Sequence, residues 1–199
     1  KSVVSGDMTS GYTITNTNVE KLSIPVIKKW VGKAGDSATV KLLADGSVKE
    51  TITLNAAGNW NHTFVNLPKY DANDGHEIVY TLDETKVNGY TTGISGTAMT
   101  GFTITNTITG KVSVPVTKKW IGKPASSAKI ELYADGVKKD SITLNEENHW
   151  QHTFINLDKY KNGAEIKYTV KEEAIANYKS VVSGDMTSGY TITNTNVEK

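Results

Sequence analysis

The sequence has no cysteine, which excludes disulfides, cysteine metal ligands and thiol catalysis. It also has no arginine: all 22 basic residues are lysines, and 21 acidic residues bring the formal net charge to +1. This balance gives no electrostatic basis for nucleic-acid binding, and arginine is the residue that most often reads phosphates and base edges. No apolar run reaches about 18 residues, so no membrane span is predicted. No signal peptide or sorting tail is recognisable, and we expect the chain to be part of a longer protein.

Two copies of one unit make up most of the sequence. IPVIKKWVG at 24–32 returns as VPVTKKWIG at 114–122, an offset of 90, and later motifs return with an offset of 88. The difference of two residues falls where DANDGHE (71–77) is replaced by KNGAE (161–165). A length change of this kind is typical of a loop between matching strands.

These offsets predict one repeat at 20–109 and a second at 110–199. The first 21 residues, KSVVSGDMTSGYTITNTNVEK, are identical to 179–199. We therefore predict that 1–19 is the C-terminal strand region of a preceding repeat whose body is missing.

Each repeat has the pattern of an all-β domain. Short alternating runs are bounded by turn residues, and Asp-Gly at 45–46 and 135–136 predicts a tight hairpin in each copy. In the first copy the predicted strands are 22–31, 38–45, 47–54, 62–67, 77–85, 90–95 and 101–108. About seven strands in about 90 residues predict tandem Greek-key β-sandwiches, Ig-like or prealbumin-like.

Three strands of each repeat place one polar group on an otherwise apolar face, because side chains two apart share a face. These groups are a lysine, a glutamate and an asparagine: Lys28, Glu84 and Asn106 in the first copy, and Lys118, Glu172 and Asn194 in the second. Burying an unpaired lysine or glutamate costs several kcal/mol, so we expect the three groups to meet. The residues alone leave open a buried ion pair with an asparagine hydrogen bond that holds the sandwich in register.

The order of these motifs resembles the Cna B-type domain, the repeated stalk module of Gram-positive surface adhesins and pilins. The motifs are TKKW (117–120), YTVKE (168–172) and ITN (192–194), and the first copy has counterparts in the same order. The resemblance covers the whole chain, with 1–18 matching the tail of a third unit.

The resemblance implies an intramolecular isopeptide bond in each repeat, Lys28–Asn106 and Lys118–Asn194. The lysine amine attacks the asparagine carbonyl and ammonia leaves, while Glu84 and Glu172 act as the catalytic proton-transfer groups. An apolar environment favours the neutral amine that this attack requires, and folding holds the reactants together. The reaction happens once per domain, so no turnover enzyme, cofactor or metal is expected. Asn16 is the orphan cross-link acceptor of the truncated repeat.

The function implied is a structural stalk repeat of a cell-wall-anchored bacterial adhesin or pilin-like protein that resists mechanical and proteolytic unfolding. Its expected place is the extracellular cell surface, attached to peptidoglycan through regions outside this chain. Its expected partners are neighbouring repeats, with host extracellular matrix or glycan contacted through other regions.

The alternative is a β-sandwich module that itself binds a host glycoprotein or glycan. Four recurring aromatic residues could form a sugar-stacking platform or pack in the core: Trp60, Trp150, Tyr70 and Tyr160. The HxxH pair His149 and His152 does not predict a metal site, because residues three apart on a strand face opposite ways and the first copy has Asn59 at the first position.

The tail at 1–18 has two interpretations. Because its sequence equals that of the last strand region of the second copy, it could replace that strand in a neighbouring molecule and give strand exchange. The alternative is a disordered or loosely docked tail.

Overall fold

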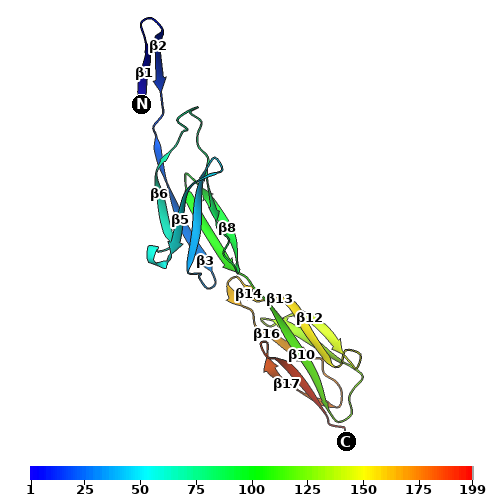
Figure 1. Cartoon of the computed structure of the whole chain (residues 1–199). Helices are drawn as coiled ribbons and strands as arrows, with labels where there is room; N and C mark the ends of the chain where they lie inside the picture. Colours follow the sequence, from blue (N-terminus) through cyan, green and yellow to red (C-terminus); the bar gives the residue numbers. More distant parts are fainter. Residues whose placement is uncertain (199) are drawn as a thin grey trace. The chain divides into compact units, whose positions relative to one another are not determined.

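The computed structural model describes residues 1–198, which divide into two compact units, the first Lys1–Ile108 and the second beginning at Thr109 (Figure 1). Strands supply nearly all of the regular structure in this range, with a short 3-10 turn at Ala56–Gly58. No helix in residues 1–198 is long and apolar enough to cross a membrane. The strands of the first unit are β1 Ser2–Asp7, β2 Gly11–Asn16, β3 Lys21–Val31, β4 Ser37–Ala44, β5 Ser47–Asn55, β6 Asn61–Pro68, β7 Tyr80–Glu84, β8 Tyr90–Thr97 and β9 Gly101–Ile108. Those of the second are β10 Lys111–Ile121, β11 Ala128–Ala134, β12 Val137–Leu144, β13 Gln151–Asp158, β14 Tyr160–Lys161, β15 Ala164–Glu165, β16 Tyr168–Glu172, β17 Tyr178–Asp185 and β18 Gly189–Asn196.

Each repeat is a sandwich of a four-stranded and a three-stranded sheet, which confirms the predicted all-β class. The sheet orders are β6-β3-β9-β8 with β5-β4-β7 in the first repeat, and β13-β10-β18-β17 with β12-β11-β16 in the second. The first and last strands of each body, β3 with β9 and β10 with β18, pair in parallel, whereas the other neighbours are antiparallel. Parallel neighbours require a long crossover connection, and here the whole body of the repeat supplies it.

The alternating pattern sends one face of each strand into the core. In the first repeat Ile24, Val26, Val40, Leu42 and Ile104 have no exposed surface. The predicted Asp-Gly hairpins are confirmed: residues 45 and 46 have φ of 48° and 80°, and residues 135 and 136 have 48° and 81°. Two consecutive positive φ values are characteristic of the type I′ turn, which matches the twist of the strands it connects.

One predicted strand is shorter than expected. The strand predicted at 77–85 is β7, which begins only at Tyr80. Before it the chain folds back on the end of β6, where Glu77 forms an isolated bridge with Tyr70 and the Ile78 amide donates to the Lys69 carbonyl. These backbone contacts take the segment out of the main sheet.

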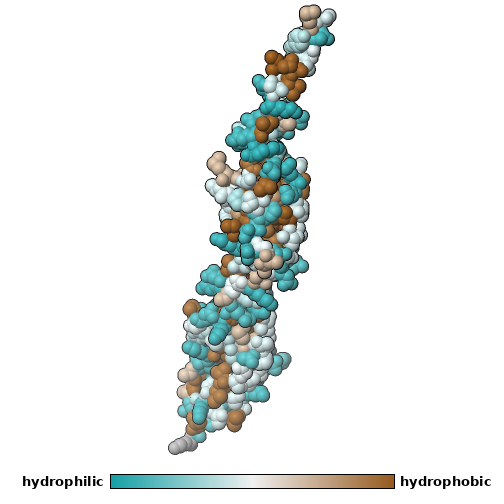
Figure 2. Space-filling view, turned by 90° about the vertical axis from the view of Figure 1, so that its left-hand side faces the viewer, coloured by the Kyte–Doolittle hydropathy of each residue, from teal (hydrophilic) through white to brown (hydrophobic). Residues whose placement is uncertain are grey.

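The N-terminal residues form a two-stranded hairpin, β1–β2, whose register repeats that of β17–β18. Val4 lies opposite Ile14 in the first hairpin, and Val182 lies opposite Ile192 in the second. All of β1 and β2 is exposed, and apolar residues lie on the hairpin surface (Figure 2). Ile14 is 67% exposed, whereas its counterpart Ile192 is completely buried. The same sequence is therefore covered by a sandwich body in one place and uncovered in the other.

Candidate functional site

Three strands of the first repeat bring Lys28, Glu84 and Asn106 into its interior. Lys28 on β3 and Asn106 on β9 come from adjacent strands of the four-stranded sheet, where Lys28 lies opposite Ile104 and Trp30 lies opposite Asn106. Glu84 is the last residue of β7, in the other sheet. All three are buried, with relative exposures of 4%, 8% and 0%. The alternating pattern had placed each of them on an inward face.

The backbone before β6 fixes the position of Lys28. Asn59 and Trp60 both have left-handed backbone conformations, and the Trp60 carbonyl accepts the amide hydrogen of Lys28 at 2.7 Å. The Trp60 ring lies edge-on against Trp30, with centroids 5.3 Å apart, and the Lys28 Nζ is 4.4 Å from the Trp30 ring centroid. The second repeat has the same arrangement at 149–150. Asparagine tolerates the left-handed conformation, but tryptophan seldom adopts it. A turn with tryptophan at its second position is therefore not predictable from residue type.

The Lys28 amine and the Glu84 carboxyl form an ion pair that is fully closed to solvent. Nζ and Oε1 are 2.7 Å apart, and neither side chain has exposed surface. Burial lowers the pKa of Lys28, and this outweighs the opposing effect of Glu84. The neutral amine is therefore easier to reach here than at the protein surface.

Among residues 1–198 the buried side-chain amide of Asn106 has no hydrogen-bond partner on either Oδ1 or Nδ2. Asn194 in the second repeat has the same unpartnered amide. An unsatisfied buried polar group costs about 1–3 kcal/mol, a large share of the net stability of a small domain. A simple hydrogen-bonding role of these asparagines in the core does not account for this arrangement.

The second repeat carries Lys118, Glu172 and Asn194 at the matching positions of its strands, with a looser ion pair. Lys118 Nζ is 3.3 Å from Glu172 Oε1, and it also donates to the backbone oxygens of Lys119 at 3.3 Å and Ile192 at 3.5 Å. Its ammonium lies 4.0 Å from the Trp120 ring centroid, and burial lowers the pKa of Lys118.

The neighbouring charged residues point outward, as the alternating pattern predicts. Lys29 and Lys119 are exposed, and Glu173 pairs at the surface with Lys129 at 2.6 Å. Asn16, the predicted orphan acceptor, lies opposite Ser2 in the hairpin and is exposed.

The aromatic residues do not form one sugar-stacking platform. Trp60 and Trp150 pack against the two core clusters. Tyr70 lies beyond the far end of β6 from Trp60, and eight extended residues span about 26 Å. Of the HxxH pair, His152 packs edge-on against Phe154 and His149 lies in the turn before β13.

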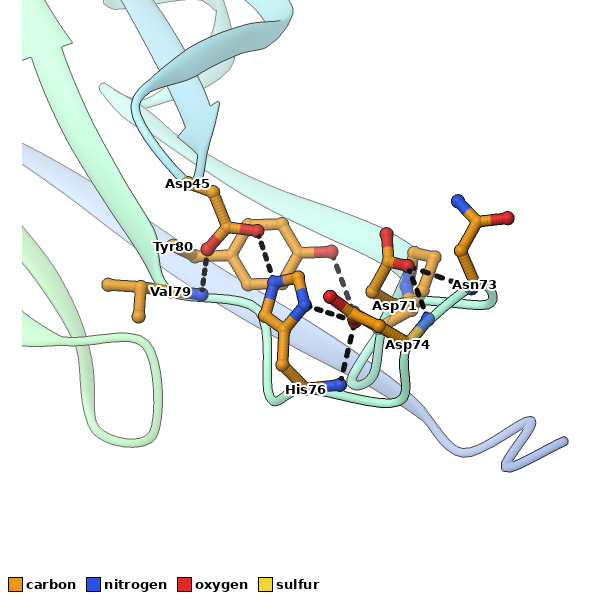
Figure 3. Close-up of polar contacts among 8 residues, drawn as sticks. Asp45, Asp71, Asn73, Asp74, His76, Val79 and Tyr80 are labelled. Carbon is orange, nitrogen blue, oxygen red and sulfur yellow. Dashed lines mark hydrogen bonds and ion pairs between the residues drawn. The ribbon is translucent and has the colours of Figure 1, made fainter.

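A polar cluster that the sequence did not reveal occupies the 71–77 loop of the first repeat (Figure 3). His76 Nδ1 contacts Asp74 Oδ1 at 2.5 Å, and Nε2 contacts Asp45 Oδ2 at 2.8 Å. Hydrogen bonding to Asp45, and then to Asp74, raises the pKa of His76 to about 9. With Asp71 these groups have the residue types of a metal site, but both ring nitrogens already face carboxylates. The cluster ties the loop to the β4–β5 turn.

The comparisons with known proteins establish the family. The model of the family described as "Cna protein B-type domain" matches residues 24–107 and 114–195. The chain belongs to this family.

A collagen adhesin of Staphylococcus aureus is 42% identical over 149 residues, which are 71% of this chain and 12% of that protein. The chain thus matches only a small part of the length of this relative. Crystal structures of one and of two B repeat units of the collagen-binding surface protein of the same organism are 36% and 35% identical. They cover 90% and 98% of this chain, which covers 100% and 55% of them, with TM-scores of 0.42 and 0.43.

The His76 cluster predicts a measurable titration. Because the folded-state pKa is raised from 6.5 to about 9, the bridge is fully formed below pH 6.5 and its stabilising effect is lost as pH rises through about 9. An NMR titration of the His76 ring should have its midpoint near 9, and Asp45→Asn should move it toward 6.5. A His76 midpoint near 6.5 in the parent protein would show that the bridge does not form.

Proposed function

We propose that each repeat closes an isopeptide bond between its buried lysine and asparagine, Lys28 with Asn106 and Lys118 with Asn194. The observation that carries the proposal is the unpartnered asparagine amide in the same interior as a buried lysine–glutamate ion pair, present in both repeats. Joining the amine to the amide removes the buried ammonium and a surplus amide nitrogen, two groups that are expensive to keep out of water.

The reaction balances without a cofactor or metal. Glu84 takes a proton from the Lys28 ammonium, and the neutral amine attacks Cγ of Asn106. A bond from Nζ to Cγ forms and the bond from Cγ to Nδ2 breaks. Ammonia leaves with the two hydrogens of Nδ2 and one proton relayed from the amine through the carboxyl, and the second proton that the ammonium loses stays on Glu84. Folding supplies the effective concentration of the reactants.

This chemistry supports a role as a structural stalk repeat of a Gram-positive surface adhesin or pilin-like protein. The bond would join neighbouring parallel strands and close about 78 residues, removing roughly 4–5 kcal/mol of unfolded-chain entropy by analogy with a disulfide. On this proposal the chain lies outside the cell, anchored to peptidoglycan through other regions. Neighbouring repeats are its partners, and contact with host matrix or glycan belongs to other parts of the protein.

The proposal makes the chain a single-turnover reactant and not an enzyme. The alternative role as a host glycoprotein- or glycan-binding module has less support. The recurring tryptophans that could have formed its binding surface pack instead against Trp30 and Trp120.

The proposal predicts the mass of the intact protein. Two bonds should lower it by about 34 Da, one ammonia of about 17 Da for each repeat. Glu172→Gln should remove the second loss only, because glutamine keeps the shape of the side chain but cannot relay the proton. Intact-mass spectrometry reads both outcomes.

Glu173→Gln is the matched control, because Glu173 is adjacent in sequence but lies at the surface, and it should keep the full loss. An unshifted parent mass would refute the cross-links, and a complete loss in Glu172→Gln would refute the role of that glutamate.

We further propose that residues 1–18 can take the place of β17–β18 in a neighbouring molecule. Identical residues make identical contacts, and Tyr12 and Ile14 are 66% and 67% exposed in the free hairpin. The hairpin would present Asn16 to Lys118 at the position that Asn194 occupies in the intact repeat.

Strand exchange predicts a covalent product between molecules. In Asn194→Ala the second repeat lacks its own acceptor, so refolding at high concentration should give SDS-resistant oligomers through Asn16. The double variant with Asn16→Ala should give none. Asn194→Ala that stays monomeric at all concentrations would favour a loosely docked tail.

A further inference from the structure

Thr92, on β8, holds the carboxyl of Glu84 in one orientation. Its hydroxyl donates a hydrogen bond of 2.8 Å to Glu84 Oε2. The other carboxyl oxygen, Oε1, contacts Lys28 Nζ at 2.7 Å. Each oxygen thus has its own partner, and the carboxyl cannot rotate without breaking one of these contacts.

Thr92 also lies directly opposite Asn106 in the antiparallel pairing of β8 with β9. Side chains of directly opposed residues project from the same face of a sheet, with Cβ atoms about 4.5–5.5 Å apart. Asn106 is completely buried on this inward face, whereas Thr92 lies on the edge strand β8 and is itself exposed. Thr92 therefore anchors Oε2 beside the residue that carries the amide, while Oε1 faces the amine.

The second repeat has serine at this place. Ser180 lies opposite Asn194 in the pairing of β17 with β18. Within residues 1–198 neither oxygen of Glu172 accepts a hydrogen bond, whereas Glu84 accepts one at Oε2 and only its Oε1, beside Lys28, accepts none. The ion-pair distance is 3.3 Å instead of 2.7 Å, and the Lys118 amine donates instead to backbone carbonyls.

The difference between threonine and serine has a physical cause. Threonine is branched at Cβ, which restricts its χ1 angle, whereas serine rotates more freely. In the first repeat the restricted hydroxyl is aimed at the carboxyl. In the second repeat the hydroxyl is not held there, and the carboxyl loses the contact that would orient it.

We infer that Thr92 is a positioning residue for cross-link formation, and that the first repeat therefore reacts faster than the second. The inference rests on the cross-link chemistry proposed above and adds no proton transfer to it. Thr92 acts only through Glu84, by keeping the carboxyl between the amine and the amide.

The test measures the rate of ammonia loss in each repeat separately. The full chain with Glu172→Ala reports only the first repeat, and the chain with Glu84→Ala reports only the second. Cell-free synthesis, quenched in denaturant at intervals and followed by intact mass, gives the time course. In the chain with Glu172→Ala, Thr92→Val should slow ammonia loss from the first repeat about tenfold, as expected for losing a hydrogen bond to a charged group. The rate of ammonia loss in Thr92→Ser should lie between the rates with threonine and with valine at this position.

The second repeat allows the converse test, in which a substitution should increase the rate of ammonia loss. Ser180→Thr in the Glu84→Ala background should speed ammonia loss toward the rate of the first repeat. A residue that merely stabilised the fold would not transfer this effect to another domain. As a folding control, Thr92→Val in a chain with Lys28→Ala and Glu172→Ala should leave the thermal midpoint within a few degrees of the same chain with Thr92.

The outcomes separate this inference from the proposed function. Ammonia loss in the parent with an unchanged rate in Thr92→Val, or with no gain in Ser180→Thr, overturns the role of Thr92 and leaves the cross-links standing. No ammonia loss from either repeat of the parent overturns the proposed function and the role of Thr92 together. A slower Thr92→Val and a faster Ser180→Thr, with an unchanged folding control, establish the positioning role.

Discussion

The contact between the Lys28 amine and the Glu84 carboxyl, repeated as Lys118 with Glu172, is the interaction on which the rest of each repeat depends. It joins the two sheets of the sandwich through a pair of groups that water cannot reach. Removing either partner would leave a buried charge without compensation, a change that typically costs about 3–5 kcal/mol. If the proposed cross-link forms, the buried lysine charge is lost when the amide is made, so the ion pair has to be tolerated only until the reaction occurs.

The sequence predicts the fold and the inward triads because both follow from a period of two. A lysine between Val26 and Trp30 on an apolar face has to enter the core, and the structure buries it. Alternation specifies the face of a strand but not its neighbours, so the parallel pairing of β3 with β9 could not be read from the pattern. The bridge from His76 to Asp45 crosses 31 residues of chain, and no local signal marks it. Thr92 was missed for another reason: a threonine on a strand is ordinary until its partner is known.

The two repeats share their buried triads and yet differ next to the same chemistry. The first has Thr92 beside its triad and a longer loop closed by His76, whereas the second has Ser180 and a loop shorter by two residues. The core clusters and sheet orders of the two are nearly the same. Two differences between the copies thus lie beside a reactive group and in a loop, while the sheet order that brings the groups together is the same.

The parallel pairing of the first and last strands decides how a pulled repeat would behave. If Lys28 and Asn106 are joined as proposed, the strands β4 to β8 lie inside a closed ring, and tension passes from β3 to β9 without entering the ring. The roughly 270 Å of contour length stored in about 78 residues could then never be released. An array of such repeats would transmit tension without lengthening and would not dissipate it by unfolding.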